Sequence, residues 1–183
     1  MNDDILNKYF DLSSGSYKKN DNGTYDVIGD VYVHKTNSLK IHFGKVQGNF
    51  KAAECGLTSL IGSPTEVTGF FYCYGNQLSS LLGGPKKVGK SFLCHDNPLT
   101  SLKGAPDSIG ENYGITLSWS ENLPLLSLLK YDFIECFGNI DVENILRKYE
   151  GNRRSAAQTS LRTAIIQCQR ELIDAGFAGN ANL

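Results

Sequence analysis

The feature that most constrains this chain is a 21-residue repeat that runs through the middle of its 183 residues. Three consecutive segments align at this shift, starting at Gly48, Gly69 and Lys90, and a degenerate fourth copy starts at Glu111. One repeat of this length cannot bury its own apolar side chains, whereas stacked repeats bury them against one another. The repeat therefore predicts a solenoid.

Five columns of the repeat keep their chemical character from copy to copy. The columns are Phe50, Phe71, Phe92 and Tyr113; Leu57, Leu78 and Leu99; Leu60, Leu81, Leu102 and Leu123; Val46, Val67, Val88 and Ile109; and Gly62, Gly83 and Gly104, each followed two residues later by Pro64, Pro85 or Pro106. A shorter copy over residues 29–39 precedes them at a spacing of 19 residues. Terminal repeats are usually atypical because they close the stack.

Residues 71–74, Phe-Tyr-Cys-Tyr, show how the strand of one copy is expected to lie. Successive side chains of a strand point to opposite faces, so Phe71 and Cys73 should face inward and Tyr72 and Tyr74 outward. Strands of neighbouring copies should then pair in parallel, about 4.8 Å apart.

The chain must leave each strand and return. Asn76 and Asn97 follow two of the strands, and their side chains are expected to bond neighbouring backbone groups in a ladder. The Gly-x-Pro pair turns the chain back, because glycine accepts a positive φ and proline fixes φ. Twenty-one residues leave no room for a long helix, so we expect short helical turns or irregular chain on the return side.

Residues 71–81 resemble the leucine-rich-repeat signature. More closely, residues 27–183 are similar to small leucine-rich-repeat-like proteins of large tailed bacteriophages, in which the unit LTSLxGxP recurs with aromatic-Cys strands. Residues 168–177 also resemble the C-terminal end of those proteins. The resemblance implies an α/β solenoid of about four to five repeats with a parallel β-sheet, and it implies no catalytic residues.

We expect three parts: an N-terminal cap over residues 1–26, the solenoid over residues 27–129 and a C-terminal helical cap over residues 130–183. In the first part, Asp3 to Phe10 suits a short helix and residues 13–23 suit a loop. Thr24 to His34 alternates in polarity and predicts a strand or hairpin.

Two helices are predicted in the C-terminal part. The first is capped by Asp141 and ends near Tyr149, and the second runs from near Ser155 to Ala175 and is ended by Gly176. The apolar side of the second is predicted to be Ala157, Leu161, Ala164, Ile165, Cys168, Leu172 and Ala175. We expect these helices to cover the last repeat; a second partner surface or a dimer contact is the alternative.

Composition favours a soluble chain. Hydrophobic residues make up 40% and the formal net charge is −1, which singles out neither a polyanion nor a membrane as the partner. The start, Asn2-Asp3-Asp4 after Met1, is unlike a secretory signal, and no apolar run approaches the ~18 residues of a membrane span. We therefore expect a cytoplasmic protein, in the host bacterium if the resemblance holds. Reduced, mostly buried thiols are then expected at Cys55, Cys73, Cys94, Cys136 and Cys168.

Residues 84–91, GPKKVGKS, match the phosphate-binding loop pattern G-x-x-x-x-G-K-S. A working loop follows a strand and precedes a helix, whereas here a repeat turn precedes the match and a strand follows it. His34, His42 and His95 form no metal-spaced cluster with cysteine, and no thiol or serine has a base beside it that the sequence can place. We therefore expect no enzyme activity, no metal and no cofactor.

Basic residues concentrate late in the chain, interleaved with acidic ones. They are Arg147, Lys148, Arg153, Arg154, Arg162 and Arg170. A solvated helix surface is the first interpretation, and contact with nucleic acid or another anionic partner is the alternative.

The outward strand positions form the candidate binding surface, because solenoids bind through such extended faces. Exposed apolar residues there would make an unusual patch for a monomer, and tyrosine is favoured at interfaces. The residues we single out are Tyr32, His34, Lys51, Phe70, Tyr72, Tyr74, Leu93 and His95. A foreign protein partner, self-association, and covering of this face by a terminal segment are the three interpretations.

The sequence thus predicts a non-enzymatic protein–protein interaction module. The resemblance suggests a phage accessory protein that binds and modulates a host or phage protein, a host defence protein among the candidates. A self-associating assembly protein and a nucleic-acid-linked factor that uses its C-terminal basic helices are the alternatives.

Overall fold

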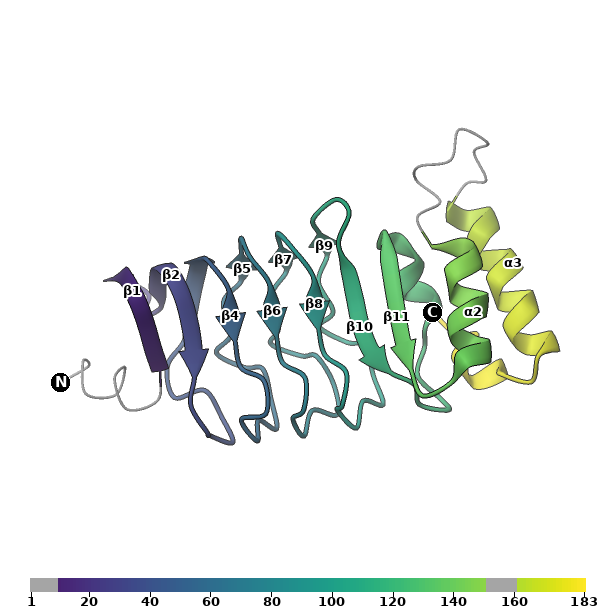
Figure 1. The fold of residues 1–183 in the computed structure, drawn as a ribbon, viewed down its shortest axis with the longest axis horizontal. Helices are drawn as coiled ribbons and strands as arrows, with labels where there is room; N and C mark the ends of the chain where they lie inside the picture. The colour runs from purple at the N-terminus through teal and green to yellow at the C-terminus, as the bar shows by residue number, and fades with distance from the viewer. Residues whose placement is uncertain (1–9, 151–160) are drawn as a thin grey trace.

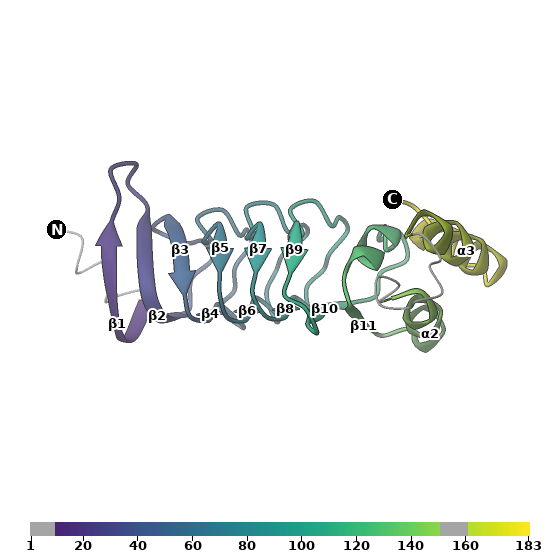
Figure 2. The same cartoon turned by 90° about the horizontal axis from the view of Figure 1, so that it is seen from above.

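The computed structural model describes residues 10–150 and 161–183, and it is a parallel β-solenoid of about five turns followed by two helices (Figures 1 and 2). Each turn contributes a strand to one or both of two parallel ladders. The first ladder contains β2 (Tyr25–Val33), β4 (Phe50–Lys51), β6 (Phe71–Tyr72), β8 (Phe92–Leu93), β10 (Gly114–Ser118) and β11 (Phe133–Phe137). The second contains β3 (Phe43–Gln47), β5 (Glu66–Val67), β7 (Lys87–Val88) and β9 (Ser108–Ile109). The long strand β2 pairs with both β3 and β4, so the two ladders form one sheet.

The second ladder corrects our expectation of short helical turns or irregular chain on the return side. Its strands are two residues long after β3, and they place Val46, Val67, Val88 and Ile109 in register. The first three of these side chains are fully buried, or nearly so. Short strands form here instead of helical turns because the backbone groups of each copy can bond to those of the next copy. The Gly89 amide, for example, donates to the Val67 carbonyl (2.8 Å).

The core confirms the alternation predicted for the strands. Phe71 and Cys73 are fully buried, whereas Tyr72 and Tyr74 are half-buried on the other side. Aromatic rings continue through the core from one turn to the next. Their centroids are 5.0 Å apart for Phe10–Phe43, 5.3 Å for Phe43–Phe50, 5.2 Å for Phe50–Phe71 and 5.1 Å for Phe71–Phe92.

The asparagine ladder is also confirmed. The side-chain oxygen of Asn76 accepts hydrogen bonds from the amides of Cys55 (3.1 Å), Gly56 (2.9 Å) and Leu57 (2.9 Å) in the preceding turn. Its side-chain nitrogen donates to the carbonyls of Ala52 and Cys73, at 2.8 and 2.9 Å. One buried amide therefore ties two turns together. Asn97 repeats the arrangement one turn later, although its oxygen accepts from one amide, that of Leu78 (3.0 Å).

The fourth copy departs from the predicted register. Ile115, not Tyr113, pairs with Phe92, so this copy is two residues longer than expected. The added residues lie in the turn before β10, where Asn112 has a φ of +66° and the Tyr113 amide donates to the Gly110 carbonyl (3.1 Å). Tyr113 is thereby moved out of the core column.

The N-terminal end differs from the predicted loop. Strand β1 (Phe10–Lys19) pairs antiparallel with β2 through a turn at residues 20–24, so the polar segment 13–19 is a strand. Its residues from Gly15 to Lys19 are exposed. Polar residues can form this strand because it lies at the edge of the sheet, where β2 supplies the partners for its backbone. Most of the helix predicted over residues 3–10 lies outside the described residues.

Two helices follow β11 at the other end (Figure 1). Helix α2 (Ile140–Tyr149) packs against β11, and α3 (Leu161–Asp174) packs against α2 and against the 3-10 helix η1 (Leu126–Lys130). A second 3-10 helix, η2 (Ala178–Asn180), follows α3. Buried Asn180 accepts a bond from the Trp119 indole (3.1 Å), and thus joins the last segment to the end of the solenoid.

Three details of this region differ from what the sequence predicts. The N-cap of α2 is Asn139, whose side chain accepts from the amides of Asp141 and Val142 (both 3.1 Å), so the prediction of Asp141 as cap is wrong by two residues. Ala175, predicted on the apolar side of the second helix, is exposed; it lies one residue beyond the end of α3 at Asp174, and Gly176 follows with a φ of +90°. Strand β11 was not predicted at all. The predicted start of the second helix, with Ser155 and Ala157, lies outside the described residues.

Candidate binding face

The outward side of the first ladder is the candidate binding face, and we call it the outer face. Its central column is fixed by strand register from turn to turn. The column contains Tyr32, Lys51, Tyr72, Leu93, Thr116 and Glu135. Parallel pairing without a shift thus places six outward side chains in one line across the molecule.

Aromatic rings on this face contact one another in a continuous series, which we call the aromatic belt: Tyr113, Phe70, Tyr72, Tyr74, His95 and Phe137. The ring centroids are 5.8 Å apart for Tyr113–Phe70, 5.6 Å for Phe70–Tyr72, 6.5 Å for Tyr72–Tyr74, 4.7 Å for Tyr74–His95 and 5.3 Å for His95–Phe137. The Tyr74 and His95 rings are stacked within 7° of parallel. This mutual packing leaves Phe70, Tyr72, Tyr74 and His95 half-buried rather than fully exposed as we expected.

The structure brings most of the predicted residues together. Phe70, Tyr72, Tyr74 and His95 belong to the belt, and Leu93 lies in register with Tyr72. The imidazole Nδ1 of His95 lies 2.9 Å from the Thr116 hydroxyl, which holds the ring against its neighbours.

The N-terminal end of the face is polar. Lys51 donates to the Tyr32 hydroxyl (2.6 Å), forms a 3.0 Å ion pair with Asp30 and lies 4.2 Å from the centre of the Tyr32 ring. The hydrogen bond to Tyr32 raises the pKa of Lys51. Burial disfavours ionised Asp30, but hydrogen bonds from Asn49 and Lys51 outweigh this and lower the pKa of Asp30. His34 follows β2 as an exposed residue outside the belt.

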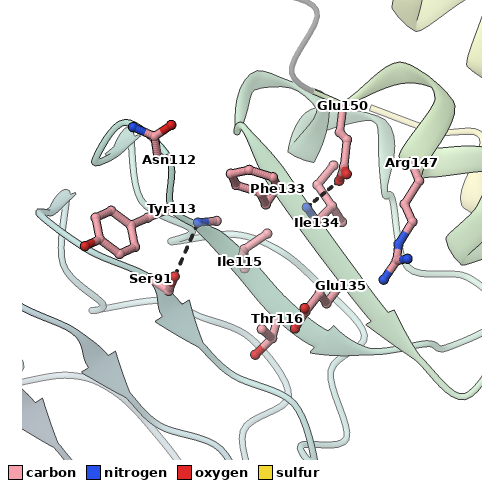
Figure 3. A pocket seen from close by; sticks show the side chains of 11 residues that line it. Ser91, Asn112, Tyr113, Ile115, Thr116, Phe133, Ile134, Glu135, Arg147 and Glu150 are labelled. Atoms are coloured by element: carbon pink, nitrogen blue, oxygen red, sulfur yellow. Dashed lines mark hydrogen bonds between the residues drawn. The ribbon is translucent and has the colours of Figure 1, made fainter.

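A pocket of about 470 Å³ lies where the outer face meets α2 (Figure 3). Its base is formed by β10 and β11, including Thr116 and Glu135, and Tyr113 lies at one side. Arg147 of α2 and Glu150, the C-cap residue of that helix, form the other side. The outer face is therefore bounded at its C-terminal end by a hollow with charged and aromatic walls.

Sequence reasoning missed Phe133, Glu135 and Glu150 as lining residues of this pocket, and it named Arg147 only among the basic residues late in the chain. Ile134 and Cys136 repeat the spacing of Phe71 and Cys73 and are likewise buried, so the strand motif was present. Ile134 pairs with Ile115, only 19 residues earlier, and the loss of the 21-residue spacing hid it. The position of α2 beside the face carries no local sequence signal.

The segment that matches the phosphate-binding loop, residues 84–91, contains β7 and the turn that leads from β7 to β8. It runs past β7 and ends just before β8, so a strand follows it and not a helix. Among residues 10–150 and 161–183, no group of three or more His, Cys, Asp or Glu side chains could hold a metal ion.

The five thiols are buried, and we expect them to be unreactive in the native chain. Burial raises the pKa of Cys136 and of Cys168 to about 12 and that of Cys73 well above its usual value, while the thiolate is the reactive form. With a disulfide reagent at pH 8, we expect only slow reaction at Cys55, which is 8% exposed, and all five thiols to react after unfolding. Rapid reaction of two or more native thiols would contradict this packing.

Comparison with protein-family models, curated proteins and solved structures finds no match to this chain. Within the described ranges, the structure contains no helix both long and apolar enough to cross a membrane.

Proposed function

We propose that this chain is a non-enzymatic interaction module that binds another protein through its outer face. We further propose that the solenoid is of the leucine-rich-repeat type, that its terminal elements act as caps, and that the chain is a phage accessory protein acting on a host protein in the bacterial cytoplasm. These finer statements rest on the sequence resemblance, whereas the binding face rests on geometry.

The observation that carries the proposal is the aromatic belt. Interfaces are enriched in tyrosine because the ring buries a large area while the hydroxyl finds a polar partner. Tyr72 and Tyr74 are pre-positioned by ring contacts on a rigid sheet, so little side-chain entropy remains to be lost on binding. The helices α2 and α3 follow β11 at the end of the solenoid and leave the middle of the face uncovered (Figure 1).

The charges of the C-terminal helices favour a protein partner over nucleic acid. Arg147 pairs with Glu143 at 2.7 Å, and Lys148 pairs with Glu171. Basic groups that are already paired with carboxylates release fewer phosphate counterions on nucleic-acid binding.

A tagged pull-down from host lysate tests the proposal. The variant Tyr72→Ala/Tyr74→Ala should lose a stoichiometric partner that the wild type captures, because anchor residues at an interface each contribute about 2 kcal/mol or more. The matched control is Ile61→Ala/Leu82→Ala, which removes two side chains, 57% and 48% exposed, from neighbouring turns outside the outer face. This control should keep the partner, and circular dichroism should show both variants folded.

Capture that is indifferent to the two tyrosines would contradict the outer face as the binding site. Self-association would instead be the function of this face if the molecular mass of the purified protein rose with its concentration and was lower for the tyrosine variant.

A further inference from the structure

The pocket at the end of the outer face has a chemistry that the aromatic belt does not share. It is lined by the carboxylates of Glu135 and Glu150 and by one guanidinium, that of Arg147. Arg147 is already paired with Glu143, which is not part of the lining. The lining therefore retains an excess of negative charge.

Neither carboxylate is ion-paired within residues 10–150 and 161–183, although the charge of Arg147 acts on Glu150 and favours its ionised form. Glu150 also accepts a 2.6 Å hydrogen bond from the Ile134 amide. Burial raises the pKa of Glu150, since it disfavours the ionised form. A cation in the pocket would offset this burial.

The base and side of the pocket suit a flat cation. Gly114 belongs to the lining and contributes no side chain to it, so backbone forms that part of the wall. The rings of Tyr113 and Phe133 also line the pocket (Figure 3). Guanidinium groups stack on aromatic rings and donate hydrogen bonds to carboxylates in the same plane.

We propose that this pocket receives an arginine side chain that the partner protein inserts at the C-terminal end of the outer face. The inference deepens the proposed function and rests on it, because the pocket is continuous with the aromatic belt through Tyr113 and Thr116. The guanidinium would lie between carboxylates and rings, with Glu135 as its main acceptor. Glu135 ends the central column of the face, so the inserted side chain would fix the register of the partner along it.

A titration of the full chain with a small probe tests the pocket alone. The probe is N-acetyl-arginine amide, and its matched control is N-acetyl-citrulline amide, which has nearly the same shape without the charge. We expect saturable NMR shifts at the amides of residues 114–116 and 133–135 with the arginine probe, and at least about tenfold weaker binding of citrulline, since hydrogen bonds to charged groups are the stronger ones.

Glu135→Gln should weaken the arginine probe by about tenfold, whereas Glu121→Gln, an exposed residue outside the pocket, should leave it unchanged. Equal shifts with arginine and citrulline, or no shifts at these residues, would overturn the inference without touching the proposed function. If the probe binds at Glu135 while the tyrosine variant still captures its partner, the pocket binds arginine but the proposed function fails, and with it the insertion of a partner's arginine along the outer face.

Discussion

Replacement of Asn76 with alanine is expected to lower the free energy of unfolding by about 4 kcal/mol or more, the largest effect that we expect for a polar substitution among residues 10–150 and 161–183. The change leaves the amides of Cys55, Gly56 and Leu57 without their acceptor and removes three bonds to carbonyls, those of Ala52, Cys73 and Tyr74. A buried group without a partner costs about 1–3 kcal/mol, and some of these groups will recover partners by local rearrangement. Such a loss is a large fraction of the ~5–15 kcal/mol that stabilises a domain.

Denaturant unfolding followed by circular dichroism measures this effect. Asn97→Ala should cost less, because the Asn97 oxygen accepts from one amide rather than three. Gln77→Ala, an exposed neighbour, should stay within about 0.5 kcal/mol of the wild type. Equal stability of the Asn76 and Gln77 variants would show that the ladder is not what joins these turns.

Phe71→Ala should cost about 3–5 kcal/mol, the range for truncating a buried phenylalanine in a core that cannot collapse. Phe71 is fully buried and stacks on Phe50 at 8° and on Phe92 at 4°, so the cavity would open in the middle of the ring series. Rigid turns on both sides limit relaxation, because each is tied to its neighbour by backbone bonds.

The same unfolding measurement separates inward from outward positions. Tyr72→Ala, one residue away on the half-buried outer face, should cost much less than Phe71→Ala, and Phe71→Leu should recover part of the loss. If Tyr72→Ala proved as costly as Phe71→Ala, the tyrosines would be core residues and the pull-down variant would be unsuitable.

The features that the sequence predicted correctly are those that recur from one copy of the repeat to another. The inward ring column from Phe50 to Phe92 and the valine column follow from identical spacing in three copies, the asparagine ladder follows from the same spacing in two, and the structure confirms all of them. Stacking forces each copy into the register of its neighbour, so a periodic pattern is enough to place these side chains.

The features that the sequence did not predict arise from departures from the 21-residue repeat and from contacts between elements that are distant in the sequence. Two extra residues before Ile115 moved Tyr113 from the core to the outer face, where it meets Phe70. The polar strand β1 exists because β2 offers it a partner, and its own residues give little strand signal. The pocket beside Arg147 requires α2 to pack on β11, and no local pattern specifies that arrangement.

Site-specific photo-crosslinking tests the central claim, that the outer face binds another protein, most directly. A photoreactive benzoylphenylalanine would replace Leu93, between Tyr72 and Thr116 in the central column, or Leu82, which is 48% exposed outside the face. We expect one discrete crosslink to a different protein from position 93, in cells of the bacterium proposed as host, and none from position 82. Crosslinks to a different protein from position 82 but not from position 93, or crosslinks from position 93 only to a second copy of the chain, would contradict it.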